Sequence, residues 1–455
     1  MLSNPSRQTP AESGYGKSNN LFIPGEAVVV TQWDPASPLH SITSFQDLSL
    51  GEDLLKGIYD KKFERPSKIQ EHALPLLLRD PPEHLIAQSQ SGTGKTAAFS
   101  LAVLRRIDYS DPGTQAIVLA PTRELARQIV GVMKELAKFT SATITPVIRQ
   151  EILRRVQVAG QVIVGTPGTV MDLVKRRHIS AAKVKLLVLD EADYMLDLQG
   201  LRLQTILFKR LLPRNIQLVM FSATWGERVI SYTKEFISAP ANQIRLPLDK
   251  QIMTNIKQFY VDCDSESDRL EILSELYSLI SVSQSIIFVK RRNIAERITA
   301  MMEDKGHAVS FLHGALSPDN RDDRIDMFRS AKFKILITTN VLARGIDISN
   351  VNLVINYDVP TTPDPDAAYV KERSDRETYL HRIGRTGRFG RLGVCVNFVH
   401  NRGSFEMLND IREYFECTIL QMPTNLLMKN GVALTDQKAE RLERLEAFFK
   451  EHMKL

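Results

Sequence analysis

Short apolar runs recur along this chain and restrict it to one fold class. A first series lies in the N-terminal half, at Leu85–Ala87, Ala116–Ala120, Val162–Val164, Leu186–Leu189 and Leu218–Phe221. Segments with a helical pattern, such as Glu124–Phe139 and Ile206–Leu212, lie between these runs. Strands without polar alternation are buried on both faces, so their alternation with helices predicts a parallel α/β sheet with crossover helices.

The pattern then restarts in the C-terminal half. The second series of runs is Ile286–Val289, Val309–Leu312, Ile335–Ile337, Leu353–Ile355 and Val394–Phe398. Between the two series, Ile244–Asn255 carries Pro247, charges and little apolar periodicity, which is typical of a linker. A length of 455 residues also favours two or three domains. We predict two α/β domains, residues 41–246 and 256–455, joined by a linker over residues 247–255.

The two ends of the chain differ from these domains. Residues 1–40 are rich in Ser, Asn, Pro and Gly, which predicts a flexible extension, and they do not resemble a signal peptide. Near the other end, Thr435–Met453 has Leu442, Leu445, Phe448 and Phe449 at helical spacing among charges. This pattern predicts an amphipathic helix docked on the second domain.

Composition excludes some classes of protein. Apolar residues make up 43% and charged residues 25%, as in ordinary globular proteins. No apolar run reaches the roughly 18 residues of a membrane span. Cys263, Cys395 and Cys417 lack metal-ligand spacing and are interpreted as small apolar side chains in a reducing compartment. The net charge of +6 is compatible with a nucleic-acid partner but does not require one. A soluble intracellular protein is expected.

A glycine-rich turn follows the first strand and opens a helix. This setting predicts a phosphate-binding loop, because backbone N–H groups and the helix dipole face the phosphates there. The predicted nucleotide-binding residues are Ser89, Ser91, Gly92, Thr93, Gly94, Lys95 and Thr96. Lys95 adds a point charge, and the Thr96 hydroxyl is suited to Mg²⁺. Ser89 stands where the general pattern has Gly, and a chance Gly/Ser/Thr loop is the alternative.

An acidic strand end strengthens the nucleotide hypothesis. The apolar run Leu186–Leu189 ends in Asp190 and Glu191. We predict that Asp190 holds Mg²⁺ together with Thr96 and that Glu191 orients and deprotonates the attacking water. Such clusters are usually solvated helix starts, but this one follows a phosphate loop. The pair of motifs therefore predicts binding and hydrolysis of a nucleoside triphosphate.

The remaining motifs of the first half resemble those of DEAD-box RNA helicases. Phe63–Gln70 is similar to the adenine-reading motif, which implies that Gln70 bonds the adenine edge, that Phe63 stacks on it and that Arg65 lies beside them. Pro121–Ala126 and Thr166–Thr169 resemble the RNA-backbone motifs. In these, Arg123, Thr166 and Gly168 would contact RNA. The segment Ser222–Thr224 matches the motif that couples the nucleotide site to the RNA site, with Ser222 and Thr224 as the coupling residues.

The second half completes the resemblance. Thr338–Asn340, Ala343–Asp347 and His381–Arg388 match family motifs in the right order. The resemblance implies RNA contacts by Gly314, Thr338 and Arg344, nucleotide contacts by Gly345 and Asp347, and coupling by His381 and Arg382. Arg385 and Arg388 would reach the γ-phosphate as arginine fingers, with catalysis shared by Lys95, Asp190 and Glu191. ATP and Mg²⁺ are the implied cofactors, in two tandem RecA-like domains.

Taken one at a time, some of these residues also fit ordinary structural roles. Thr166 could cap a helix and Arg344 could form a surface ion pair, but the ordered set favours the family. Ala315 replaces an acidic residue usual in the family, Pro318 replaces a polar one, and no paired-glycine motif is visible near Arg149–Ile152. These departures concern RNA contacts and domain coupling, and the nucleotide motifs are unaffected.

Individual residues within and beside these motifs are similar to those of the family branch that acts in mRNA export at the cytoplasmic face of the nuclear pore. Ser89, Thr169 and the segment Asp34–Leu39 fit that branch. It implies remodelling of messenger ribonucleoproteins, a monomer in cytoplasm and nucleus, and single-stranded RNA as ligand. It also implies a pore-bound activator with inositol hexakisphosphate and a propeller nucleoporin as partners, and a role in translation termination.

Several questions stay open at this stage. An ATP-gated RNA clamp would use the same residues as an unwinding enzyme, and an initiation-factor-like helicase would share every core motif. A DNA-translocating motor is the least favoured class. Thr361–Thr378 is longer and more polar than the branch pattern, and we predict an exposed loop there, either a tolerated insertion or a partner-binding loop.

Overall fold

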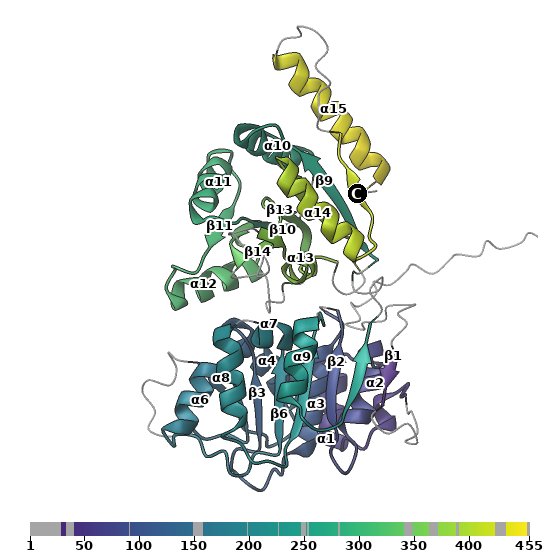
Figure 1. The fold of residues 1–455 in the computed structure, drawn as a ribbon, viewed down its shortest axis with the longest axis vertical. Coiled ribbons are helices and arrows are strands. Elements are labelled where there is room, and N and C mark those ends of the chain that lie inside the picture. Colours follow the sequence, from purple (N-terminus) through teal and green to yellow (C-terminus); the bar gives the residue numbers. More distant parts are fainter. Residues whose placement is uncertain are drawn as a thin grey trace, which may run out of the picture.

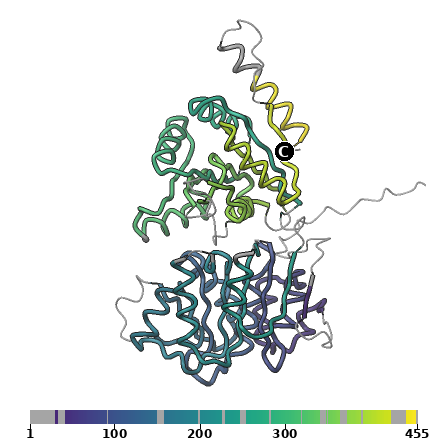
Figure 2. Tube along the Cα trace, in the orientation of Figure 1, coloured from purple at the N-terminus to yellow at the C-terminus, as the bar shows by residue number. Residues whose placement is uncertain are grey.

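The computed structural model consists of two α/β units (Figure 1). It describes residues 29–32, 41–90, 92–148, 158–197, 199–225, 227–246, 252, 254–280, 283–340, 348, 350–363, 372–387, 391–423 and 434–452. Figure 2 shows that the chain completes the N-terminal unit before it forms the C-terminal one. Each unit is a mainly parallel sheet with helices on both faces, which confirms the predicted fold class.

The N-terminal sheet contains all five predicted strands of the first series and three more. Its order is β1-β8-β2-β7-β6-β3-β5-β4, and only β1 is antiparallel to its neighbour. The strands are β1 (Val29–Thr31), β2 (His84–Gln88), β3 (Ala116–Leu119), β4 (Ile144–Val147), β5 (Val162–Gly165), β6 (Leu186–Asp190), β7 (Gln217–Ser222) and β8 (Ala241–Arg245). The carboxyl ends of β2, β6 and β7 deliver the predicted nucleotide and coupling motifs to one edge.

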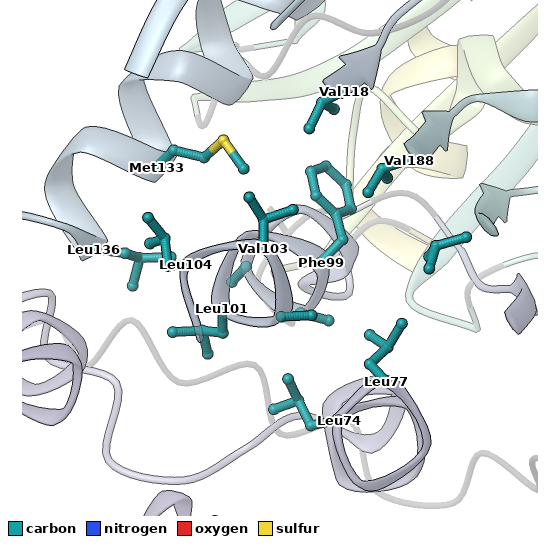
Figure 3. Close-up of a cluster of buried hydrophobic side chains, with 14 of the residues drawn as sticks. Leu74, Leu77, Phe99, Leu101, Val103, Leu104, Val118, Met133, Leu136 and Val188 are labelled. Atoms are coloured by element: carbon teal, nitrogen blue, oxygen red, sulfur yellow. The ribbon is translucent and has the colours of Figure 1, made fainter. Parts of the chain in front are cut away.

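Helices cover both faces of this sheet. They are α1 (Glu52–Asp60), α2 (Lys68–Leu77), α3 (Lys95–Arg106), α4 (Arg123–Leu136), α6 (Pro167–Lys175), α7 (Ala192–Asp197), α8 (Gln199–Lys209) and α9 (Glu227–Phe236), with a 3-10 turn at Phe45–Asp47. Figure 3 shows α3 enclosed by side chains of α2, α4 and the sheet, with Phe99 and Val103 facing Val118 and Val188. Residues 97–104 of α3 are all buried, as expected for a helix without a polar face. Lys95, the first residue of this enclosed helix, is buried as well.

The C-terminal sheet has seven parallel strands in the order β11-β12-β10-β13-β16-β9-β17. They are β9 (Ile256–Asp262), β10 (Gln284–Phe288), β11 (Val309–Leu312), β12 (Ile335–Thr338), β13 (Val351–Asn356), β16 (Gly393–Val399) and β17 (Ile419–Gln421). Its helices are α10 (Glu266–Leu279), α11 (Arg292–Asp304), α12 (Pro318–Arg329), α13 (Arg376–Ile383), α14 (Arg402–Tyr414) and α15 (Leu434–His452).

The boundary between the units falls in the predicted region. The first sheet ends with β8 at Arg245 and the second begins with β9 at Ile256. The prediction that Ile244 already belongs to the linker is wrong, because Ile244 lies in β8 and is fully buried. The prediction of a flexible extension over residues 1–40 is wrong for Val29–Thr31, which form β1 and pair with β8. The predicted domain limits and the rest of the extension stay predictions.

The C-terminal helix is docked as its spacing predicted. Leu445 and Phe449 of α15 are buried in the core of the second unit. Arg441 donates to Asp268 at 2.9 Å and to Glu275 at 2.8 Å, both on α10. Cys263 and Cys395 are buried, as predicted, and Cys417 is half-buried. None of the helices in the described ranges is long and apolar enough to span a membrane.

The predicted loop over Thr361–Thr378 contains regular structure instead. Two short strands, β14 (Thr361–Pro363) and β15 (Glu372–Ser374), pair antiparallel, and α13 begins at Arg376. Residues 364–371 lie outside the described part of the chain. We call β14 and β15 the hairpin. It departs from the loop prediction because residues such as Thr361 and Thr362 are β-branched and favour strands.

Candidate nucleotide and RNA site

The phosphate loop lies between β2 and α3, and its geometry requires glycine. Gly92 and Gly94 have φ values of +77° and +99°, in the left-handed region. A Cβ on Gly94 would lie 2.5 Å from the side-chain nitrogen of Gln70. Lys95 is buried, and its ammonium donates to the Ser89 carbonyl at 3.0 Å. The Lys95 side chain thus folds back onto the phosphate loop.

Ser89 has a definite place in this loop. Its hydroxyl lies 2.6 Å from that of Thr93, which in turn donates to the Gln90 carbonyl at 2.9 Å. The side chain that departs from the general pattern therefore braces the turn internally. Ser91 lies outside the described residues.

Gln70 ties the predicted adenine-reading motif to the phosphate loop. Its amide nitrogen donates to the Gly94 carbonyl at 3.1 Å, and its amide oxygen accepts from the Ser67 N–H at 2.9 Å. Phe63 is half-buried against the core, and Arg65 is exposed. Contact of these residues with adenine stays a prediction, but their motif is joined to the loop by direct hydrogen bonds.

The acidic strand end is buried at the same edge of the sheet. Asp190 ends β6, and its Oδ1 accepts from the Glu191 N–H at 3.1 Å. Burial, followed by the charge of Glu191, raises the pKa of Asp190 to about 7, although Lys95 acts in the opposite direction. Burial also acts to raise the pKa of Glu191, but His381, Lys95 and Arg385 together lower it.

This donor set fits a divalent cation. A buried carboxylate whose pKa is raised is stabilised in its charged form by a nearby cation. Carboxylate and hydroxyl oxygens are the ligands that Mg²⁺ prefers. Asp190 and the half-buried Thr96, in the first turn of α3, would hold the ion. Glu191 has a φ of +54°, an uncommon backbone conformation that is typical of functional sites.

Asp193 joins the two units. One of its carboxylate oxygens lies 2.6 Å from the Thr224 hydroxyl, which donates to it, and 3.2 Å from Nε2 of His381. Ser222 completes the arrangement, because its hydroxyl donates to the Thr224 carbonyl at 2.8 Å and accepts from the Thr224 N–H. Sequence reasoning paired His381 with the coupling motif, but it counted Asp193 only as part of the acidic motif and gave it no role between the units. Its position in the acidic motif was the available signal.

The second unit also reaches the predicted catalytic residues. Nδ1 of His381 lies 3.5 Å from Oε2 of Glu191. Arg385 is buried, and its Nε donates to the His381 carbonyl at 3.0 Å. Arg388 lies outside the described residues, as do Gly345 and Asp347. The structure thus brings Lys95, Asp190, Glu191 and Arg385 together, and their catalytic roles stay predictions.

Arg382 makes its hydrogen bonds within the second unit. Its guanidinium donates to the side chains of Asn356 at 3.0 Å and Asn340 at 2.6 Å, and to the Asp358 carbonyl at 2.8 Å. Burial lowers the pKa of Arg382 to about 10. All three of these contacts lie within the second domain. Because Arg382 belongs to α13, any coupling role through them would depend on the position of that helix.

A groove of about 680 Å³ gathers three of the predicted RNA-binding residues. Arg123, Thr166 and Gly168 line it together with Arg321 of the second unit. Thr166 precedes α6, but its side chain makes no capping bond and lies 3.0 Å from the Thr169 hydroxyl instead. Thr166 therefore occupies the N-cap position of α6 without the side-chain capping bond, and RNA contact stays a prediction.

The predicted RNA-binding residues of the second unit are not gathered in this way. Thr338 is fully buried, and the carbonyls of Leu312 and Thr339, at 3.0 Å and 2.9 Å, are the acceptors within reach of its hydroxyl. Gly314 is exposed, and Arg344 lies outside the described residues. A second pocket, of about 330 Å³, is lined by Thr339, Asn340 and Lys290 instead. Sequence reasoning included Thr339 in a family motif without a contact of its own, and it missed Lys290.

A charged contact joins α4 to α12 beside the groove. Asp322 lies 3.4 Å from Nη2 of Arg123 and contacts Nη1 of Arg127. Glu124 lies 3.1 Å from Nε of Arg123. Asp322, which sequence reasoning missed, therefore holds a predicted RNA-binding arginine from the opposite unit.

Family models match both units of the chain. Residues 67–231 match the model described as DEAD/DEAH box helicase, and residues 268–390 match the helicase conserved C-terminal domain. Together they cover more than half of the sequence. The chain belongs to the DEAD/DEAH box helicase family. This confirms the family resemblance drawn from the motifs.

Within this family, the chain is similar to proteins named Dbp5. It is 53% identical to the ATP-dependent RNA helicase dbp5 of Schizosaccharomyces pombe over 395 residues, which are 87% of this chain and 77% of that protein. It is 47% identical to S. cerevisiae Dbp5 bound to RNA and ADP BeF3, with a TM-score of 0.80 over 89% of this chain and 100% of the other. It is 45% identical to a single-residue variant of S. cerevisiae Dbp5 bound to Nup159, a Gle1 variant, IP6 and ADP. The TM-score is 0.63, over 90% of this chain and 100% of the other.

Asp193→Asn tests the joint between the two units of the helicase. Asn keeps the shape but loses the charge that His381 and Thr224 share, and a hydrogen bond to a charged group contributes about 1.5–3 kcal/mol. We expect RNA-stimulated ATP hydrolysis to fall tenfold or more, while affinity for a fluorescent ATP analogue, measured by titration without RNA, stays the same. Loss of nucleotide affinity would instead make Asp193 part of the nucleotide site.

Proposed function

We propose that this helicase uses ATP-driven closure of its two domains to remodel RNA–protein complexes during mRNA export from the nucleus. The observation that carries the proposal is Asp193, which binds Thr224 of the first domain and His381 of the second beside the predicted catalytic Glu191. The buried Asp193 carboxylate thus links the nucleotide-binding residues of the first domain to the position of the second domain. The similarity to Dbp5 in its RNA-bound form, at a TM-score of 0.80, supports the same interpretation.

The residues then have the following proposed roles. Lys95 and the backbone of the phosphate loop bind the phosphates of ATP, with Gln70, Phe63 and Arg65 at the adenine. Thr96 and Asp190 hold Mg²⁺, which supplies charge neutralisation at the phosphates when bound. Glu191 orients and deprotonates the water. Arg385 and Arg388 stabilise the charge that develops on the γ-phosphate, so hydrolysis requires the closed arrangement.

RNA binding is proposed for the groove beside Arg123. Its lining of hydroxyls, a glycine N–H and arginines suits phosphate and sugar, and sequence-independent binding follows. Contacts to the 2′-OH would distinguish RNA from DNA. The initiation-factor-like alternative is disfavoured by the similarity to Dbp5 over 87% of the chain. An RNA clamp with little unwinding uses the same residues and stays the second candidate.

Partners and location follow from the relatives. A variant of S. cerevisiae Dbp5 has been solved with Nup159, a Gle1 variant, IP6 and ADP. We infer that this helicase likewise binds a pore-bound activator with inositol hexakisphosphate and a propeller nucleoporin, at the cytoplasmic face of the nuclear pore.

An ATPase titration tests the proposal. Hydrolysis should be slow alone, should rise severalfold with single-stranded RNA but not with single-stranded DNA, and should rise further with the activator and inositol hexakisphosphate. Equal stimulation by RNA and DNA would contradict an RNA-specific enzyme. Failure of the activator alone would contradict the export assignment and spare the helicase activity. Strand displacement measured beside RNA release separates unwinding from clamping.

Asp322→Ala is expected to weaken the coupling of closure to RNA binding. The substitution removes the carboxylate of α12 that contacts Arg123 and Arg127. Because the Asp322 side chain is only 14% exposed, the loss should exceed that of a surface pair. We expect RNA affinity in the presence of ATP analogue to fall by about threefold to tenfold. Asp323→Ala, an exposed change on the same helix, is the control. Equal effects of both variants would contradict a specific contact.

A further inference from the structure

The pocket of about 330 Å³ lies between the two domains and has the lining of an anion site. Lys290, Thr339 and Asn340 come from the carboxyl ends of β10 and β12, where open α/β sheets bind their ligands. Tyr194 of α7 closes the pocket from the first domain, and Thr361 of the hairpin forms part of its wall. Figure 1 shows β14 on the side of the C-terminal unit that faces the N-terminal unit.

Lys290 and Arg382 are the cations in the described lining of this pocket, and the hairpin engages the ammonium of Lys290. The backbone N–H of Lys290 donates to Asp358 at 2.7 Å, which fixes the residue at the pocket. Its Nζ donates to both carboxylate oxygens of Glu372 at 2.5 Å and lies 3.3 Å from the Thr361 hydroxyl. A lysine ammonium has three donors. The hairpin therefore provides an acceptor for each of them.

Glu372 is held at this position from two sides. The Thr361 hydroxyl donates to it at 2.9 Å across the hairpin. On the other side, Ser374 contacts Asp410 of α14, and Arg376 donates to that carboxylate at 2.9 Å. The Arg376 guanidinium also stacks on the Tyr414 ring at 4.2 Å. Strand β15 is thus anchored to α14, and Glu372 is presented to the pocket from a supported strand.

Lys290 and Glu372 stay accessible to a ligand. Their side chains are 49% and 46% exposed. The hydrogen bond from Lys290 is the main cause that lowers the pKa of Glu372, so the carboxylate is charged at neutral pH. The other charged groups at the pocket are already engaged, since Arg382 binds Asn340 and Asp358 pairs with Arg269 at 2.9 Å. The ammonium of Lys290 is consequently the group that a competing anion can take.

We infer that Glu372 competes with an RNA phosphate for the ammonium of Lys290, so that the hairpin lowers the affinity of the second domain for RNA. The inference rests on the proposed RNA-binding function and adds a self-inhibiting contact to it. Carboxylate and phosphate oxygens both accept from an ammonium, and Lys290 cannot hold both in the same geometry. RNA binding would thus displace Glu372, and the hairpin would have a function beyond that of a tolerated loop.

Glu372→Gln tests this inference in the full-length protein. An exposed ion pair is worth about a factor of 1.5 to 5 in an equilibrium constant. We expect the variant to bind a fluorescent single-stranded RNA two- to fivefold more tightly in the presence of ATP analogue. The slope of log affinity against log salt should steepen by about 0.7, the contribution of one added phosphate contact on a single strand. Glu446→Gln, which removes the exposed partner of Lys450 on α15, is the matched control.

A double-mutant cycle identifies the route of the effect. Lys290→Gln should weaken RNA binding, and Glu372→Gln should have no further effect in that background. A gain that persists in the Lys290→Gln background would indicate general repulsion and overturn the inference. So would unchanged or weaker binding by Glu372→Gln alone. If Lys290→Gln is without effect while RNA still stimulates hydrolysis, the pocket is not an RNA subsite and the proposed function stands.

Discussion

Replacing Glu191 by Gln is expected to lower ATP turnover by about a hundredfold to ten-thousandfold while leaving ATP binding intact. A positioned general base contributes this much to a rate. Glu191 is buried, and His381, Lys95 and Arg385 counter the effect of burial and lower its pKa, so it is a charged base at neutral pH. Gln fills the same space but cannot accept the proton of the attacking water.

The variant should therefore retain both ligands. We expect RNA bound in the presence of ATP to dissociate more slowly than from the unmodified protein, because hydrolysis no longer opens the domains. Single-turnover hydrolysis and RNA dissociation measure the two effects. Glu235→Gln, on the surface of α9 in the same domain, is the matched control. Turnover within threefold of the unmodified protein would exclude Glu191 as the base, and loss of ATP binding would make it a ligand-binding residue.

Strands that are buried along their whole length were predictable from sequence, and the strands that were missed in the two large sheets lie at an edge or next to one. Strands such as β6 and β10 are buried along their whole length, and burial on both faces leaves an uninterrupted apolar run. The missed strands β1, β4 and β17 are edge strands, and β8 and β9 lie next to an edge. Their buried residues are interrupted by partly exposed or polar ones, as in β9, β4 and β17, so they lack that signal.

The nucleotide residues could be predicted because they are local, and the contacts between domains could not. The phosphate loop is one turn between β2 and α3, so its chemistry can be read from consecutive residues. The pair formed by Asp322 and Arg123 joins residues 199 positions apart, and no local pattern specifies it. Asp193 was visible in its motif, but the phase of α7 decides that its side chain meets His381.

Thr338 and Thr339 show a limit of residue-level prediction. Successive side chains of a strand point to opposite faces, so one of two neighbouring threonines turns inward. Thr338 ends β12 and bonds the Leu312 carbonyl inside the domain, while Thr339 lines the pocket with Lys290. A motif of two threonines predicts that a hydroxyl is needed there, but the choice between them depends on the strand's register.

Replacing Arg385 by Ala is expected to lower RNA-stimulated ATP hydrolysis by about a thousandfold or more. Arginine fingers are worth 10³ to 10⁵ in turnover because they stabilise charge that develops only in the transition state. Arg385 is delivered by α13, beside His381, and it acts with His381 and Lys95 to lower the pKa of Glu191. Its removal should affect turnover far more than ATP affinity.

A structural effect of this change can be separated from the chemical one. Arg385 is buried and donates to the His381 carbonyl, so Ala could shift the end of α13. Arg385→Lys keeps a cation but loses the planar fork, and we expect it to retain the melting temperature and remain at least a hundredfold slower. If Lys restores most of the rate, a point charge suffices and no bidentate contact is needed. If both variants hydrolyse ATP at the unmodified rate with RNA bound, Arg385 contributes no charge to the reaction, and Arg388 would be the arginine left to supply it.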